Sequence, residues 1–177
     1  MKIWTIPNIL SLIRILLIAP AAHYLWYGQN TIAALICVFA ALLDISDGYI
    51  ARKFNQISEL GKILDPIGDK GFFVAVTIIL LIQDRMPLWF AAVIIGRDVL
   101  ILIGGLIVAN RKKIVEPSHR SGKNAAVAIS LTLLALIVNM PYAMPYMLIF
   151  SLIFITISLW DYGKVFFETL RSPAKAV

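Results

Sequence analysis

The chain has little charge and almost no cysteine, and each shortage excludes a class of protein. Of its 177 residues, 15% are charged and 60% are hydrophobic, whereas soluble globular chains average about 25% charged residues. The single cysteine, Cys37, excludes an intramolecular disulfide and leaves no cysteine cluster to bind a metal. The composition therefore predicts an all-α integral membrane protein rather than a soluble domain or a disulfide-rich scaffold.

The apolar segments predict six transmembrane helices after a short interfacial segment at residues 1–6. Arg14 interrupts the first apolar run, which argues against a cleaved signal peptide. We expect the whole chain, residues 1–177, to form a single membrane domain. The expected spans are residues 9–27, 31–52, 62–81, 88–109, 124–138 and 147–167.

The net charge of +6 does not indicate nucleic-acid binding, because the basic residues gather at the ends of the expected spans. The amino terminus, the loops after the second and fourth spans, and the carboxyl-terminal tail hold most of them, whereas the opposite loops contribute Arg85. The positive-inside rule then places both termini on the cytoplasmic side, and a bacterial cytoplasmic membrane is the expected location.

Four aspartates stand in or beside these apolar segments: Asp44, Asp47, Asp65 and Asp69. An ionised carboxylate at the centre of a bilayer costs about 2.5–3.5 kcal/mol on insertion scales, so four uncompensated ones would cost on the order of 10 kcal/mol. Residues three or four apart share a helix face, so each pair points one way from its helix. A polar turn between the second and third expected spans would bring the two aspartate pairs together. This predicts a functional site formed by the four carboxylates.

Four carboxylates carry a charge of about minus four, which two divalent cations would neutralise, and hard oxygen ligands favour Mg²⁺, Mn²⁺ or Ca²⁺. Two such ions can stabilise the attacking and leaving oxygens of a phosphoryl transfer. The alternative is a set of structural ion pairs with nearby basic residues. These are Arg52, Lys53, Lys62 and Lys70.

The same stretch carries a longer pattern, Asp44-x2-Asp47-Gly48-x2-Ala51-Arg52-x8-Gly61-x3-Asp65-x3-Asp69. It resembles the signature of the CDP-alcohol phosphotransferases over about 26 residues, and eight fixed positions make the match specific. Members of that family are integral membrane enzymes, often homodimers, that move a phosphatidyl or phosphoalcohol group from a CDP-linked donor to an acceptor hydroxyl. The resemblance implies that the four aspartates hold two Mg²⁺ or Mn²⁺ ions and that Asp69 is the general base.

The resemblance also implies a donor site along the first three spans. Gly48 and Ala51 would open a slot for the nucleotide, and Arg52 would meet the diphosphate, with Gly61 completing the pattern. Small residues on membrane helices more often serve helix packing, and Arg52 would equally suit a topology anchor.

Near the amino terminus, Pro7-Asn8-x2-Ser11-x2-Arg14 is similar to a motif of the same family, in which threonine is usual at the position of Ser11. The implied role of Asn8 and Ser11 is to line the donor site. The alternatives are helix capping by Asn8 and snorkelling of Arg14 to the interface.

Two regions could bind the acceptor. Arg97 and Asp98 stand in the middle of the fourth span, where charged residues should face the protein interior. Ser118, Arg120 and Lys123 precede or open the fifth span and could hold a phosphate at a helix amino terminus. The alternative for this basic loop is a cytoplasmic anchor.

The expected reaction is transfer of a phosphatidyl group from CDP-diacylglycerol to glycerol 3-phosphate with release of CMP, in contact with membrane lipid. The family's cardiolipin synthases, which use phosphatidylglycerol as acceptor, are the alternative. From a different class, an ion-binding transporter could also hold intramembrane aspartates, but the repeated discontinuous helices of such proteins are not found here.

Overall fold

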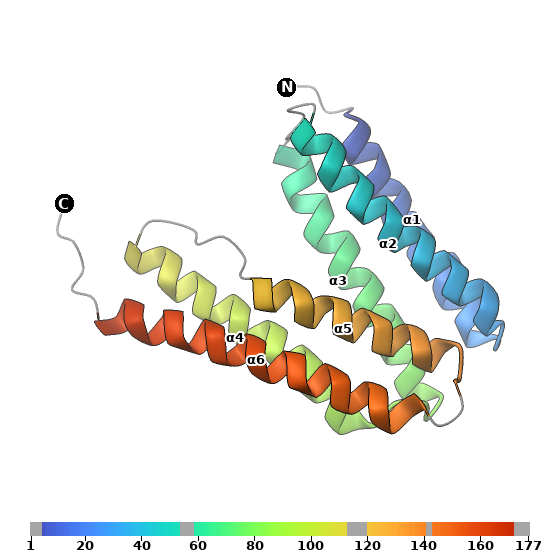
Figure 1. Cartoon of the computed structure of the whole chain (residues 1–177). Coiled ribbons are helices and arrows are strands. Elements are labelled where there is room, and N and C mark those ends of the chain that lie inside the picture. Colours follow the sequence, from blue (N-terminus) through green and yellow to red (C-terminus); the bar gives the residue numbers. More distant parts are fainter. Residues whose placement is uncertain (1–4, 54–58, 113–119, 141–142, 172–177) are drawn as a thin grey trace. The chain divides into compact units, whose positions relative to one another are not determined.

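The computed structural model describes residues 5–53, 59–112, 120–140 and 143–171, and these form six helices (Figure 1). The expectation of an all-α chain is confirmed, and each expected span coincides with one helix to within a few residues. The helices are α1 (Ile6–Trp26), α2 (Asn30–Lys53), α3 (Glu59–Ile82), α4 (Leu88–Lys112), α5 (Arg120–Ile137) and α6 (Ala143–Arg171).

Four of these helices contain segments long and apolar enough to cross a membrane, considering the described residues alone. The segments are Asn8–Trp26, Asn30–Asp47, Leu88–Gly105 and Met144–Thr169. A shorter apolar segment, Lys70–Ile82, lies in α3. Large apolar side chains such as Leu16 and Leu100 point outward, as expected of helices surrounded by lipid. Four helices are therefore long and apolar enough to span a membrane, and the count of six spans stays a prediction.

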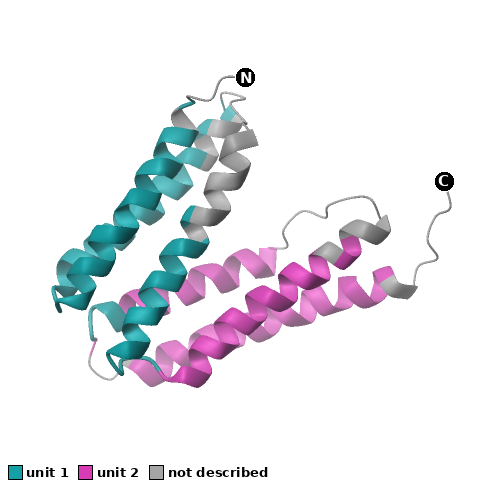
Figure 2. Ribbon diagram, turned by 180° about the vertical axis from the view of Figure 1, so that it is seen from behind, with its two compact units in different colours: residues 1–86, 136–139 teal, residues 87–135, 140–177 magenta. Residues whose placement is uncertain are grey.

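The chain divides into two compact units (Figure 2), of which the first holds residues 1–86 and 136–139. In this unit α1 packs against both α2 and α3. Alanines such as Ala21, Ala33 and Ala40 are nearly fully buried, and small residues let membrane helices approach closely. The arrangement places one face of α1 beside the ends of α2 and α3 that carry the aspartate pattern.

The second unit holds residues 87–135 and 140–177, in which α4 packs against α6. Hydroxyl groups connect α5 to α6, since Thr132 Oγ1 lies within hydrogen-bonding distance of Ser151 Oγ. Ser151 Oγ also donates to the carbonyl oxygen of Ala128 at 3.0 Å. Because both hydroxyls are fully buried, these bonds compensate for the loss of solvent and fix the register of the two helices.

Three helices end in the same way, with one residue in the left-handed conformation. These residues are Gly28 (φ 74°), Asp84 (φ 55°) and Asn139 (φ 54°), types that adopt this conformation at least cost. After α1, the amide of Gln29 donates to the carbonyl oxygen of Tyr24 at 2.8 Å, which closes the last turn as in a Schellman motif. The turns after α3 and α5 carry equivalent bonds, so local chemistry sets these three reversals of the chain.

Candidate functional site

The first aspartate pair stands at the carboxyl-terminal part of α2. Asp47 is buried, with 4% of its surface exposed, while the side chain of Asp44 is about half exposed at 47%. The two residues are three apart and both contact the same side chain of α1, so they share one face of α2, as their spacing predicts. The shared face is confirmed, and the convergence of this pair with the second pair stays a prediction.

That shared partner is Arg14. Its guanidinium forms an ion pair with Asp44 through Nη1 and Oδ1, and its Nη2 lies 3.8 Å from Asp47 Oδ2. The arginine is 2% exposed, so it does not extend to the interface, and the snorkelling alternative is wrong. A charge at this depth is stable because two carboxylates face it.

One further residue of the amino-terminal motif contacts this cluster. Ser11 is fully buried, and its Oγ donates to Asp47 Oδ2 at 3.5 Å. Asn8 is also buried, at 4% exposure, one turn earlier on α1. Thr5 occupies the cap position of α1, so the capping alternative for Asn8 is wrong. The motif therefore contributes polar side chains to the aspartate site.

The backbone of α3 approaches the same place. A Cβ atom added at Gly68 would lie 3.0 Å from Arg14 Nε, so α3 and the guanidinium are in close contact there. Asp65 precedes Gly68 by three residues and Asp69 follows it, both within α3. The side chains of these two aspartates are not among those that the structure describes. The same holds for the surroundings of four residues predicted to bind the donor, which are Gly48, Ala51, Arg52 and Gly61.

The helix bounds differ from expectation at Gly61, which we expected to precede the third span. The structure begins α3 at Glu59, so Gly61 lies in its first turn. A single glycine lowers helix propensity only at its own position, so α3 can begin at Glu59, two residues before Gly61.

Metal binding by all four aspartates stays a prediction. Among the described side chains, no group of three or more histidine, cysteine, aspartate or glutamate residues is close enough to hold a metal ion. The described half of the set nevertheless suits a hard divalent cation, because Asp44 and Asp47 present carboxylate oxygens from one helix face. The completing ligands would have to come from Asp65 and Asp69.

A second polar cluster surrounds Arg97 in the other unit. Its Nη1 donates to Asp98 Oδ1 at 2.7 Å, and its Nη2 donates to the carbonyl oxygen of Gly122 and to Ser158 Oγ, both at 3.1 Å. Arg97 and Asp98 therefore do pair, which the sequence left open. The cluster joins α4, α5 and α6, and Arg97 faces the protein interior as expected.

The basic residues of the predicted acceptor site are less enclosed. Arg120 and Lys123 are exposed in the first turn of α5, which begins at Arg120 and not after Lys123 as expected. Ser118 lies outside the described residues. Between the two cations, Ser121 Oγ is buried and has no hydrogen-bond partner in the described part of the chain. The same is true of Arg97 Nε.

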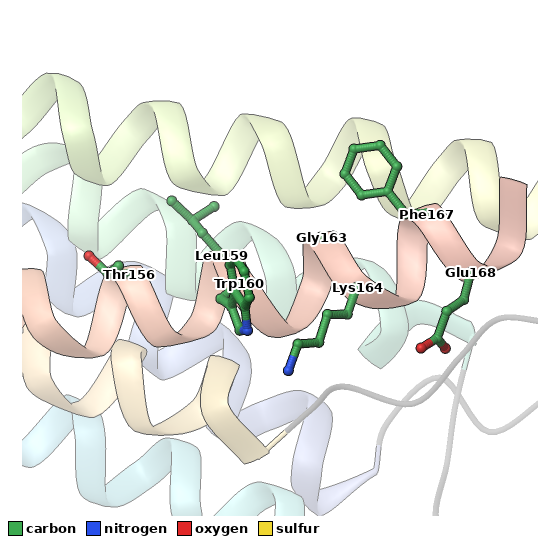
Figure 3. A pocket seen from close by; sticks show the side chains of 7 residues that line it. All are labelled: Thr156, Leu159, Trp160, Gly163, Lys164, Phe167 and Glu168. Carbon is green, nitrogen blue, oxygen red and sulfur yellow. The ribbon is translucent and has the colours of Figure 1, made fainter.

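A shallow hollow of about 700 Å³ runs along α6 and contains none of the predicted site residues (Figure 3). Lys164 Nζ lies 5.4 Å from the centroid of the Trp160 ring, a cation–π contact. Tryptophan and lysine near the end of an apolar helix are typical of a membrane interface, which explains this surface without a substrate. The hollow is lined by Thr156, Leu159, Trp160, Gly163, Lys164, Phe167 and Glu168.

The fold and these clusters define a helical membrane protein in which one aspartate and two arginines, Asp47, Arg14 and Arg97, are buried between apolar helices. The chain matches the family model for CDP-alcohol phosphatidyltransferases over residues 4–160. It therefore belongs to that family, and the resemblance stated from the aspartate pattern is confirmed.

Individual relatives are similar to parts of the chain. A CDP-diacylglycerol–glycerol-3-phosphate 3-phosphatidyltransferase of Aquifex aeolicus is 38% identical over 134 residues, which cover 74% of each protein. The protein of the same description from Pseudomonas fluorescens is 42% identical over 54% of this chain and 52% of its own length. A cardiolipin synthase/mitochondrial hydrolase fusion protein of Schizosaccharomyces pombe is 46% identical over 57% of this chain and 17% of its own length.

Ser158 and Gly122 belong to the Arg97 cluster, and sequence reasoning missed the role of both. Ser158 is one of several hydroxyl residues in an apolar helix, and nothing local distinguishes it. The unexplained arginine in the middle of the fourth span was the available signal, because a buried guanidinium requires acceptors from neighbouring helices.

Proposed function

We propose that the chain catalyses the metal-dependent transfer of a phosphatidyl group from CDP-diacylglycerol to glycerol 3-phosphate, with release of CMP. The observation that carries the proposal is the aspartate pair on α2, of which Asp47 is buried, contacted by the amino-terminal motif in a chain of this family. The descriptions of the Aquifex and Pseudomonas relatives support this choice of acceptor.

Asp44, Asp47, Asp65 and Asp69 would hold two divalent cations, Mg²⁺ or Mn²⁺. Such ions would supply positive charge to the donor diphosphate and to departing CMP. Asp69 accepts the proton of the acceptor hydroxyl as its oxygen attacks the phosphorus nearest the diacylglycerol. The bond from that phosphorus to the bridging oxygen breaks, and CMP leaves with the electron pair.

The donor would lie along α1, α2 and α3. Ser11 presents its hydroxyl from α1 to Asp47, and Asn8 is buried one turn earlier on α1, which supports a place for both at the site rather than at the interface. Gly48 and Ala51 would give the nucleotide room, Arg52 would bind diphosphate oxygens through its planar fork, and Gly61 completes the family pattern.

The acceptor phosphate would be bound by cations of the second unit. Arg97 is held by three acceptors and keeps a buried Nε–H group without a partner in the described residues, which suits an anionic ligand. Arg120 and Lys123 stand at the amino terminus of α5, where exposed backbone amides also favour phosphate. Ser118 precedes them.

We further propose that all six helices span the membrane, in one domain over residues 1–177, as a homodimer in a bacterial cytoplasmic membrane. Both termini and the aspartate site would face the cytoplasm, where CDP-linked donors and water-soluble acceptors occur. The support is the distribution of lysine and arginine along the chain, together with a family match that runs through both compact units.

Phosphatidylglycerol is the second candidate acceptor, which would make the chain a cardiolipin synthase. The identity of 46% to the Schizosaccharomyces fusion protein favours it, although this match covers 102 residues. The transporter alternative loses its support with the family assignment.

The test supplies purified protein with CDP-diacylglycerol and Mg²⁺ or Mn²⁺ and follows CMP release with one acceptor at a time. Release with glycerol 3-phosphate and not with phosphatidylglycerol, inositol phosphate or serine is expected. Release with phosphatidylglycerol alone would replace the proposed reaction by cardiolipin synthesis.

A further inference from the structure

We propose that Arg14 is the internal counter-cation of the aspartate site. Its charge stabilises the carboxylates of Asp44 and Asp47 and opposes the binding of divalent cations to the same oxygens. The inference rests on the proposed function, because it assigns Arg14 an effect on the metal affinity of that site.

The contacts of the guanidinium carry the first step. Arg14 lies in the apolar segment Asn8–Trp26, is 2% exposed, and contacts oxygens of both aspartates. An arginine stays protonated in proteins, so this is a permanent positive charge. Asp47 is buried as well, and burying a carboxylate in an apolar setting is costly unless a cation lies close to it.

The shape of α3 carries the second step. Gly68 lies beside the guanidinium, and a Cβ atom there would be 3.0 Å from Arg14 Nε and 3.4 Å from its Nη2. One turn further, a Cβ atom at Gly71 would be 2.9 Å from Ile18 Cδ1, an apolar methyl group. Gly68 therefore leaves room for the charged group, whereas Gly71 accommodates ordinary packing.

The consequence follows from Coulomb's law. A unit positive charge within hydrogen-bonding reach of a ligand oxygen repels a dication at that oxygen, and the repulsion is weakly screened in an apolar setting. Removing the charge should therefore tighten metal binding about tenfold, while the protein without metal loses stability. Damage to the fold alone would lower stability and weaken metal binding together.

The experiment uses the full chain in detergent and measures Mn²⁺ binding from the electron paramagnetic resonance of free Mn²⁺. Thermal unfolding midpoints are measured in EDTA and in Mn²⁺. Arg14→Gln should bind Mn²⁺ about tenfold more tightly, unfold at a lower temperature in EDTA, and gain more from Mn²⁺ than the wild type. Arg14→Lys, which keeps the charge, should bind Mn²⁺ within about threefold of the wild type.

Arg85→Gln is the matched control. It removes the same charge from the same unit, but Arg85 Nη1 donates to the neutral Asn30 Oδ1 at 2.8 Å. Its Mn²⁺ affinity should equal that of the wild type. If Arg14→Gln does not fold, Gly68→Ala replaces it, with Gly71→Ala as control. The methyl group added in Gly68→Ala should press on Arg14 Nε, weaken the ion pair with the aspartates and tighten Mn²⁺ binding at least about threefold. Gly71→Ala should leave Mn²⁺ binding unchanged.

The outcomes separate the two proposals. Mn²⁺ binding that is unchanged or weaker in Arg14→Gln, with normal binding by the wild type, overturns the counter-cation and leaves the metal site standing. A wild type that binds no Mn²⁺ contradicts the metal site itself, and the counter-cation with it. An equal gain in Arg85→Gln would show a general effect of net charge and would also overturn the inference.

Discussion

Replacing Ser158 with alanine tests whether the Arg97 cluster serves the acceptor. Ser158 is fully buried, and its Oγ accepts a hydrogen bond of 3.1 Å from Arg97 Nη2. The substitution removes that acceptor and little else. Arg97 keeps its bonds to Asp98 and to the carbonyl oxygen of Gly122, so the guanidinium is loosened rather than released.

The magnitude follows from those bonds. A hydrogen bond to a charged group contributes about 1.5–3 kcal/mol, but the two remaining bonds retain part of the orientation of Arg97. A loss of about 0.7–1.4 kcal/mol in acceptor binding corresponds to a factor of about three to ten in KM. The KM for CDP-diacylglycerol should stay within about twofold, because the donor is assigned to the aspartate site of the other unit.

The assay is CMP release at saturating CDP-diacylglycerol with glycerol 3-phosphate varied. Ser151→Ala is the matched control, since Ser151 is an equally buried serine of α6 that bonds to Ala128 and Thr132. It should lower the unfolding midpoint and leave both KM values unchanged. If the two variants change the KM for glycerol 3-phosphate equally, or if neither changes it, the assignment of Arg97 to the acceptor is refuted.

Four further changes have distinct expected results. Asp69→Asn should abolish CMP release while sparing CDP-diacylglycerol binding more than Asp44→Asn does. Equilibrium dialysis of a labelled donor measures this binding. An equal loss in both variants would contradict the assignment of Asp69 as base and Asp44 as metal ligand. Gly122→Ala should destabilise the protein by about 1–3 kcal/mol, because its Cβ would lie 2.9 Å from the Tyr162 hydroxyl. Gly105→Ala has open space around it and should be neutral or stabilising by up to about 1 kcal/mol in thermal unfolding; a loss there would indicate that Gly105 packs against another chain. EDTA should stop CMP release, and Mg²⁺ or Mn²⁺ should restore it; full activity in EDTA would exclude the metal mechanism.

The sequence predicts the helices well because lipid imposes a simple rule: an apolar run of sufficient length becomes a helix. Gly28, Asp84 and Asn139 adopt the left-handed conformation and end α1, α3 and α5. Glycine, aspartate and asparagine between apolar runs are the residue types expected at such turns. Boundaries shift by a few residues where charged residues continue a helix beyond its apolar run. Arg120 and Lys123 are examples, expected before α5 and found in its first turn.

The site was predictable where spacing and chemistry agree. Asp44 and Asp47 are three apart on one helix, and any counter-ion must come from a neighbouring helix, but the pattern could not say that Arg14 supplies it. Sequence spacing also left open whether Arg97 pairs with Asp98. Both answers depend on which helix faces meet, and this is a property of packing between segments far apart in the chain.

The central claim is tested most directly by following labelled glycerol 3-phosphate into lipid. Purified protein is given CDP-diacylglycerol and Mg²⁺, and the organic phase is analysed for labelled phosphatidylglycerophosphate, with Asp69→Asn as the control. We predict one labelled lipid for each CMP released by the wild type and none from the variant. CMP release without labelled lipid, or equal labelling by the variant, would contradict the account.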